Sequence, residues 1–227
     1  MEEPYAIELE PEVSAWLDTL SRAEYRAVEF KVDRLAASPT TLGEPWTRHL
    51  EGPVRELRFR LNGASVRIGY WLAPGQRLVL DRVPQDPNAR NARSQPSNSG
   101  SERVRGRTRR RHSYLRPYLQ GGPAMIRAHH TRWKIPDEHR ADPEYIAAAD
   151  AFALAQAVYD RRAKLGITQT ELARRAGMTQ PQVSRLEGGD VTPTLPLLHR
   201  LSIALEAELK LSFKGEELAV EFVDRAA

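Results

Sequence analysis

Residues Gly166–Leu186, with the sequence GITQTELARRAGMTQPQVSRL, constrain the fold of this chain more than any other stretch. Two short helices are predicted there because each begins with a capping signal. Thr168 is followed by Glu171, and Thr179 is followed by Gln182, so each hydroxyl can accept a backbone N–H while the acid or amide reaches back. The pattern predicts two helices that begin close together in the chain.

A sharp turn between the two helices is predicted at Gly177, because glycine adopts the left-handed backbone without steric cost. Pro181 falls in the first turn of the second helix, where its missing N–H is not needed. Apolar side chains at helical spacing predict a close crossing of the two helices, and these side chains are Leu172, Ala173, Val183 and Leu186. Together these signals predict a helix-turn-helix, and the alternative is an ordinary αα-hairpin in a bundle.

The helix-turn-helix resembles the Cro/C1-repressor (XRE) family of DNA-binding domains, which have a lambda-repressor-like fold. The resemblance implies that Gln169 anchors to the phosphate backbone and that the second helix reads base edges in the major groove. Glutamine pairs well with adenine and arginine with guanine. The implied DNA-binding residues are Gln169, Thr179, Gln180, Pro181, Ser184, Arg185 and Thr192.

The loop after the second helix is also implied to approach the phosphate backbone, through Glu187, the glycines that follow it, Thr192 and Thr194. For the two threonines the alternative is plain helix capping, and we expect Thr194 to cap the helix that begins near Leu195.

The formal net charge of +4 does not come from this motif. Residues 83–124 hold nine basic and two acidic residues, whereas residues 1–82 hold eleven and thirteen, and residues 125–227 hold fourteen and fifteen. We therefore expect DNA affinity to rest on the local placement of arginine and polar groups and on dimerisation.

Several classes of site and location are excluded by composition. The chain has no cysteine, so it has no disulfide and no thiolate metal site. His129, His130 and His139 are expected to be solvated side chains, and no metal or cofactor is expected. No apolar run reaches membrane-spanning length and the N-terminus is acidic, so we expect a cytoplasmic protein without membrane contact.

Residues 1 to about 82 are predicted to form two helices and an antiparallel meander. A strand is expected at Tyr5–Leu9, followed by two helices whose apolar residues recur at helical spacing up to Ser38. The period then changes to two, and Asn62-Gly63 is a strong hairpin signal between strands at 54–61 and 66–72. Pro74-Gly75 predicts the turn into a third strand at 77–80.

This succession, with RELRFRLNGASVRIGYWLAPGQRLVL at its centre, resembles the RelE/ParE toxin superfamily, especially the HigB-type mRNA interferases. The resemblance implies cleavage of mRNA on the ribosome by basic residues, here Arg55, Arg58, Arg60 and Arg67. Such groups would orient the 2′-hydroxyl and stabilise the phosphorane. The alternative is that these arginines form a solvated face of the sheet.

Residues 83–124 are rich in Pro, Asn, Ser, Gly and Arg and are predicted to be a disordered linker. The arginine run Arg107–Arg111 is typical of a nucleic-acid-binding linker, but we favour another hypothesis, in which residues from about 81 to 124 are translated out of frame. Synonymous codons permit a neighbouring frame that encodes the basic helix expected after the third strand. If so, the interferase activity is weak or absent and the first domain is incompletely packed.

Residues 125–227 are predicted to form the second domain, with Met125 as an independent start. Asp142-Pro143 opens one or two helices that run to Leu165. After the helix-turn-helix, the sequence AELKLSFKGEELAVEFV predicts a hairpin at Lys214-Gly215, whose edge strand can pair across a two-fold axis or pack on its own domain. Antitoxins of the HigA type resemble this combination.

The expected fold class is therefore α+β: a RelE-like domain at 1–82, a linker at 83–124, and an all-α helix-turn-helix domain with a short hairpin extension at 125–227. The resemblance implies an antitoxin-type regulator that dimerises on a palindromic DNA operator, represses its own operon and neutralises a RelE/HigB-like toxin. The alternatives are an mRNA interferase that acts on mRNA at the ribosome, and a module whose toxin-like part docks within the chain.

Overall fold

The computed structural model describes residues 3–81, 130–215 and 217–224. The predicted linker at 83–124, the proposed start at Met125 and His129 lie outside these residues. The chain is α+β, as expected, with a sheet in its N-terminal part and helices in its C-terminal part.

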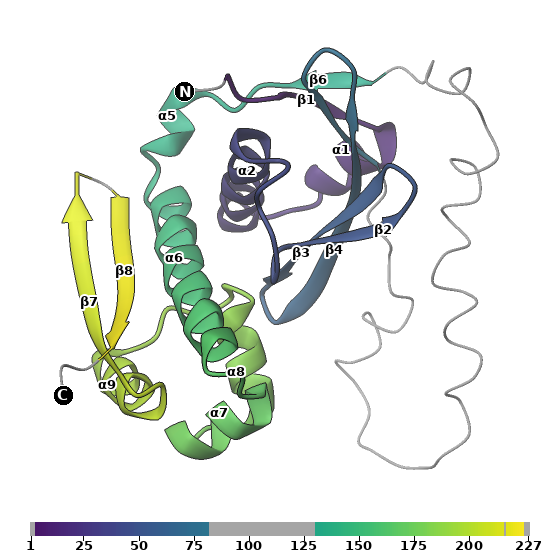
Figure 1. Ribbon diagram of the computed structural model, residues 1–227. Coiled ribbons are helices and arrows are strands. Elements are labelled where there is room, and N and C mark those ends of the chain that lie inside the picture. The colour runs from purple at the N-terminus through teal and green to yellow at the C-terminus, as the bar shows by residue number, and fades with distance from the viewer. Residues whose placement is uncertain (1–2, 82–129, 216, 225–227) are drawn as a thin grey trace, which may run out of the picture.

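The elements follow the order of the sequence patterns closely (Figure 1). The N-terminal part contains β1 (Ala6–Leu9), α1 (Pro11–Leu17), α2 (Arg22–Ala37), β2 (Thr47–Glu51), β3 (Val54–Leu61), β4 (Ala64–Ala73) and β5 (Arg77–Leu80). The C-terminal part contains β6 (Thr131–Trp133), α5 (Asp137–Arg140), α6 (Pro143–Lys164), α7 (Gln169–Ala176), α8 (Gln180–Glu187), α9 (Leu195–Ala204), β7 (Ala207–Lys214) and β8 (Glu217–Asp224).

The larger sheet has the strand order β2-β3-β4-β5-β1-β6. Strands β3, β4 and β5 form the expected antiparallel meander. Asn62 and Gly63 have φ of 49° and 79°, the left-handed pair that a tight hairpin turn needs. The sequence did not predict β6, which pairs antiparallel with β1 and so places residues of the second part at the edge of the N-terminal sheet.

The first core lies between this sheet and α2. Val28, Val32 and Leu35 are spaced so that they share one face of the helix, and they are almost completely buried. The capping box of Ser21 and Glu24 fixes where the helix begins. Alternate residues of β3 and β4, such as Leu57 and Ile68, face the same core from the sheet.

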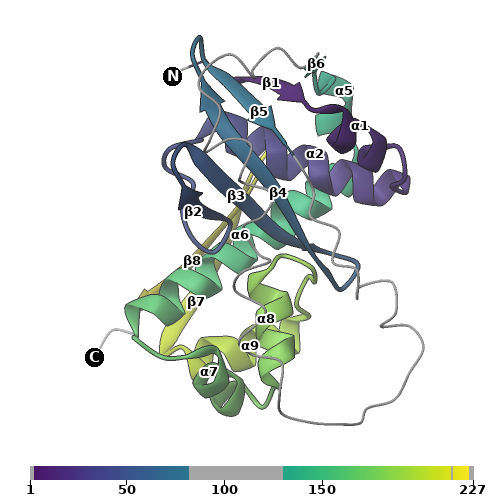
Figure 2. The same cartoon turned by 90° about the vertical axis from the view of Figure 1, so that its right-hand side faces the viewer.

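Helix α6 is a single helix of 22 residues that belongs to two cores. Both views show it between the sheet with α2 and the helix-turn-helix (Figures 1 and 2). Phe152 and Ala155 complete the core of the sheet, whereas Val158, one turn further on, belongs to the core of α7, α8 and α9. The Phe152 ring stacks on the buried Trp46 ring with centroids 4.2 Å apart.

We expect the first domain by itself to be incompletely packed, and in the structure its core is completed by residues from the second part of the chain. Trp133, Ile135 and Phe152, all from the second part, supply apolar surface to the core of the first. The expected missing cover is replaced by residues that come later in the same chain.

A network of ion pairs joins the polar face of α2 to α5 and α6. Arg22 and Arg26 both donate to the Asp142 carboxylate, at 2.8 and 3.0 Å. The buried Glu29 carboxylate lies 2.9 Å from Nδ1 of His139 and accepts from Arg26. These charges have partners on the opposite helix, which offsets the cost of removing them from water.

The hairpin of β7 and β8 follows α9 and lies on the other side of α6 from the sheet (Figure 1). Strand β8 packs on α6, while the outer edge of β7 pairs with no strand in the described part of the chain. No helix within the described residues is long and apolar enough to cross a bilayer.

We expect Phe152→Ala to lower the free energy of unfolding by about 3 to 5 kcal/mol, because it leaves a cavity against Trp46 in a core that both parts share. Denaturant unfolding followed by tryptophan fluorescence and by circular dichroism measures this loss. Both probes should shift together, and a shift in one transition alone would contradict the shared core.

Candidate nucleic-acid interface

The helix-turn-helix forms from the signals that predict it. The Thr168 hydroxyl accepts the N–H of Glu171 at 3.1 Å, and Gly177 ends α7 with the left-handed φ of 62°. The Gln182 side chain accepts the backbone N–H of Thr179 at 2.8 Å. Leu172 and Val183 are fully buried between the helices, so the orientation of α8 is set by the core.

Most of the residues implied to face DNA lie on the outside of α8. Thr179, Gln180, Pro181 and Arg185 are exposed, and Ser184 is half-buried. They occupy the first turns of one helix, which is the part of a recognition helix that enters the major groove. The structure therefore brings these five residues together on one accessible surface.

Arg185 differs from its arginine neighbours on α7. Arg174 and Arg175 both donate to the Glu171 carboxylate, at 2.8 Å each, and these hydrogen bonds hold the pKa of Glu171 at about 2. The Arg185 side chain makes no ion pair or hydrogen bond with any residue in the described ranges. Its five N–H donors thus remain available to a base or a phosphate.

Glu187 does not lie where a phosphate could approach it, and the expectation that it does is wrong. Its carboxylate is buried, with a residue exposure of 2%, and accepts from Arg162 at 2.9 Å and from Gln169 at 2.8 Å. A carboxylate held by a cation inside the fold ties the end of α8 to α6. The hydrogen bonds that Arg162 donates to Glu187 raise the pKa of Arg162.

This network extends to the predicted reading surface. Gln180 donates to the Gln169 side chain at 2.7 Å, and Gln169 in turn donates to Glu187. Gln169 therefore orients Gln180 in the free protein. Gln180 keeps its amide oxygen and one N–H for other partners.

The two threonines of the following loop differ from each other. Thr192 is exposed, as a phosphate contact requires. Thr194 occupies the expected N-cap position of α9, but its side chain makes no capping hydrogen bond.

The four arginines implied to be catalytic do not share one surface. Register places Arg58 opposite Arg67, and Arg60 two positions along the same strand, so these three lie on the face of the sheet away from α2. Arg55 lies opposite Tyr70 on the core side. Burial raises the pKa of the Tyr70 hydroxyl, and the positive charge of Arg55 opposes that rise.

The three arginines on the outer face are already occupied. Arg58 donates to Glu44 at 3.1 Å, and Arg67 lies 3.8 Å from the buried Glu56. Arg60 donates to the Gly63 carbonyl at 2.6 Å. Carboxylates beside Arg58 and Arg67 reduce the positive potential that would attract an RNA phosphate.

Lys31 lies where the sheet, α6 and the loop after α8 meet. Its ammonium group is 5.6 Å from the centre of the Trp46 ring and 5.7 Å from that of Phe59, in cation-π range. The residue is 3% exposed, and Asp190 is the charged group that acts on it. Burial lowers the pKa of Lys31 to about 8. A sequence pattern that treats lysine as a surface residue does not reveal this position.

The expectation that the histidines are solvated is wrong for His130. Its side chain is 7% exposed, and its two ring nitrogens lie 3.1 Å from Glu8 and 2.8 Å from Glu10. His139 is partly buried beside Glu29. Within the described ranges no group of three histidines or acidic residues has the geometry to hold a metal ion.

Comparison with known proteins separates the chain into the same two parts. Residues 158–210 match the family model described as helix-turn-helix, and residues 15–82 match one described as phage derived protein Gp49-like. A Methanothermobacter thermautotrophicus protein, described as an uncharacterized HTH-type transcriptional regulator, is 43% identical over 51 residues. Those residues are 22% of this chain and 74% of that protein.

No solved structure matches the chain at a significant level. The matches confirm the expected helix-turn-helix domain at the C-terminal side and a toxin-family domain of the RelE/HigB-like kind at the N-terminal side. Below, the "Gp49-like region" means residues 15–82.

Lys31→Met should stabilise the protein at pH values below 8. The pKa of Lys31 falls from 10.5 to about 8 on folding, so below pH 8 the folded state bears the full cost of burying the cation. That cost fades as pH rises from 8 to 10.5, where the lysine is neutral in both states. The gain is at most about 3 kcal/mol below pH 8, less the lost cation-π energy.

Urea unfolding at several pH values measures this gain, with Lys134→Met on the exposed surface as the control. A gain that did not shrink as pH approached 10.5 would contradict the assignment of the cost to the Lys31 cation.

Proposed function

We propose that this chain, which belongs to the family of HTH-type transcriptional regulators, binds a palindromic DNA operator as a dimer and represses the operon that encodes it. The observation that carries the proposal is the unpaired Arg185 guanidinium, exposed on the same helix, α8, as the exposed Gln180. Antitoxins of the HigA type act in this way, and the Gp49-like region supplies the toxin-family half of such a pair.

The reading chemistry follows from the side chains on α8. Arg185 presents a rigid fork of donors that matches O6 and N7 of guanine, and Gln180 retains an acceptor and a donor that match adenine. Ser184 lies between them on the same surface. Thr179 and Thr192 hold hydroxyls at the two ends of the motif, where phosphates pass in complexes of this kind.

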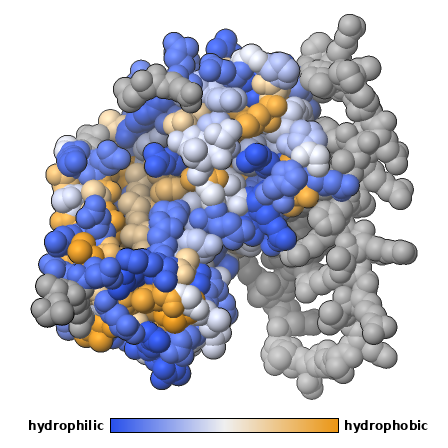
Figure 3. All heavy atoms as spheres, in the orientation of Figure 1, coloured by the Kyte–Doolittle hydropathy of each residue, from blue (hydrophilic) through white to orange (hydrophobic). Residues whose placement is uncertain are grey.

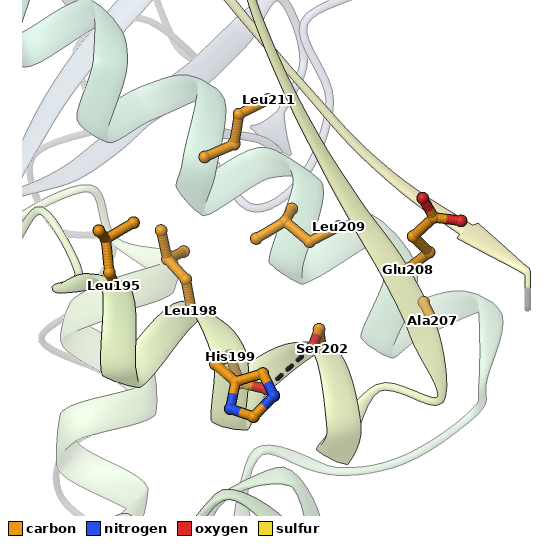
Figure 4. Close-up of a pocket in the computed structure, with 8 residues that line it drawn as sticks. All are labelled: Leu195, Leu198, His199, Ser202, Ala207, Glu208, Leu209 and Leu211. Atoms are coloured by element: carbon orange, nitrogen blue, oxygen red, sulfur yellow. Dashed lines mark hydrogen bonds between the residues drawn. The ribbon is translucent and has the colours of Figure 1, made fainter.

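The proposed dimer forms through the hairpin and α9. A groove of about 710 Å³ lies between α9 and β7 and is lined by Leu195, Leu198, Leu209 and Leu211 among others (Figure 4). Leu195 is 77% exposed, and apolar residues show at the surface over the hairpin and α9 (Figure 3). A second copy would cover these side chains and pair with the outer edge of β7.

Neutralisation of the toxin-like part is proposed to occur within the chain. Helices α5 and α6 cover α2 through the ion pairs of Arg22, Arg26 and Glu29, and β6 extends the sheet at β1. A cognate RelE/HigB-like toxin in trans is the other partner that the family resemblance implies.

We keep the out-of-frame origin of residues from about 81 to 124 as part of the proposal. It rests on two points: the family pattern is lost after β5, and synonymous codons for this segment permit a second reading frame that encodes the missing helix. The nucleotide sequence between the codons for Leu80 and Met125 decides it, because a genuine linker would show no second coding frame.

Arg185→Ala is the test of DNA reading. It should weaken binding to the preferred duplex by about 1 to 3 kcal/mol and relax specificity at one base pair, because the lost contact is to a base edge. Selection of duplexes from random DNA by the full chain, followed by titration, gives affinity, specificity and the number of chains per duplex. Arg174→Ala, which removes an arginine already paired with Glu171, is the matched control.

Equal loss of affinity for selected and random duplexes would contradict base reading by Arg185. One chain per selected duplex would contradict the dimer.

An mRNA interferase is the second candidate function, because Arg58, Arg60 and Arg67 share one face of the sheet. Their engagement by Glu44, Gly63 and Glu56 leads us to expect no growth arrest on expression of the full chain or of residues 1–124. Arrest that is abolished by Arg58→Ala but not by Arg34→Ala, on the exposed side of α2, would favour the enzyme.

A further inference from the structure

The β3–β4 hairpin of the Gp49-like region contacts the loop that follows α8. Both oxygens of the Asp190 carboxylate accept the backbone N–H of Gly63, at 3.2 and 3.0 Å. On the adjacent strand, the backbone N–H of Arg60 donates to the Gly188 carbonyl at 3.4 Å. Two backbone donors of the toxin-like hairpin therefore hold Gly188, the C-cap of the recognition helix, and Asp190, two residues further on.

The surroundings of Asp190 make this contact a specific one. The Asp190 side chain is 8% exposed, and one of its oxygens lies 4.0 Å from Nε of Arg60. The buried Lys31, which lines the same cavity as Asp190, also interacts with Asp190 electrostatically. Glu24 and Glu144 line this cavity of about 190 Å³, so the two cations are what balance the Asp190 charge.

The glycines before Asp190 show how closely the two regions approach. A Cβ atom at Gly188 would lie 2.8 Å from the side-chain carbons of Arg60, and one at Gly189 would lie 2.9 Å from the Trp46 ring. Gly189 also has a left-handed φ of 63°. The loop that links α8 to Thr192 thus passes directly over the Gp49-like region.

We propose that Asp190 is a positioning residue for DNA binding, through which the Gp49-like hairpin fixes the loop from Gly188 to Thr192. This inference rests on the proposed function of α8. Thr192, the exposed residue implied to meet a phosphate, lies two positions after Asp190. A helix-turn-helix without the Gp49-like region would lack the N–H that Asp190 accepts, and its loop would be free to move.

The coupling has a thermodynamic consequence in both directions. If the docked hairpin favours the loop position that binds DNA, bound DNA must favour the docked hairpin by the same free energy. The Gp49-like region then serves the regulator as a scaffold, whether or not it retains any chemistry of its own.

Asp190→Ala in the full chain tests the proposal, with Asp190→Asn as the conservative variant. The probe is a duplex of about 40 base pairs that the wild-type chain selects from random DNA, long enough for two half-sites. Asp18→Asn removes the same charge from an exposed position on the end of α1 and is the matched control. Affinity is measured over a series of salt concentrations, and hydrogen exchange at the Gly63 amide is measured without DNA.

We expect Asp190→Ala to weaken binding by about 2- to 30-fold, the range for residues that act through another group. It should leave the salt dependence nearly unchanged, because the Thr192 hydroxyl is uncharged and its phosphate contact releases no counterion, and it should speed exchange at Gly63. Asp190→Asn keeps one acceptor oxygen and should restore part of the affinity. Asp18→Asn should match the wild type.

Three outcomes would overturn the proposal. Unchanged affinity in Asp190→Ala, with faster exchange at Gly63, would mean that the contact exists but does not position the loop. Unchanged exchange at Gly63 would mean that the contact is not formed in solution. A wild-type chain that selects no duplex would overturn the proposed function together with this inference, whereas the first two results leave DNA binding by α8 intact.

Discussion

The packing of α6 is the interaction on which the rest of the structure depends. Its first turns cover α2 and close the core of the sheet through Phe152, and its last turns hold Val158 in the core of the helix-turn-helix. Because one continuous helix serves both cores, a change in either part is felt by the other. The sheet part and the helix-turn-helix part are therefore joined by the packing of α6 as well as by the chain between them.

The sequence predicts local structure well where a short-range signal decides it. The turn at Gly177 and the hairpin at Asn62-Gly63 depend on residues close in the chain, and both form as expected. The capping signals also act locally: the Thr168 hydroxyl accepts the N–H of Glu171, and the Gln182 side chain reaches back to the N–H of Thr179. Strand β6 was not predicted because three residues have too weak a pattern by themselves. They become a strand only through pairing with β1, far away in the sequence.

In the candidate site, too, the sequence predicts the features that local periodicity sets and misses those that distant residues set. The exposed side chains of α8 follow from helical periodicity, so Gln180, Ser184 and Arg185 could be named from the sequence. The burial of Glu187, Lys31 and His130 could not be, because each side chain has its partner on another element: Arg162, Asp190, and the pair Glu8 and Glu10. Pattern rules place charged residues at the surface, and a polar partner inside the fold is what offsets the cost of burying one.

The position of β6 also bears on how the chain is made. A ribosome releases residues 1–82 first, with the outer edge of β1 open and α2 uncovered, because the residues that fill both places follow residue 130. Domains generally fold as they emerge during synthesis. Here the N-terminal region reaches its final core only after most of α6 has left the ribosome. Unpaired strand edges invite association with other chains, so this nascent interval is when the protein is most exposed to aggregation.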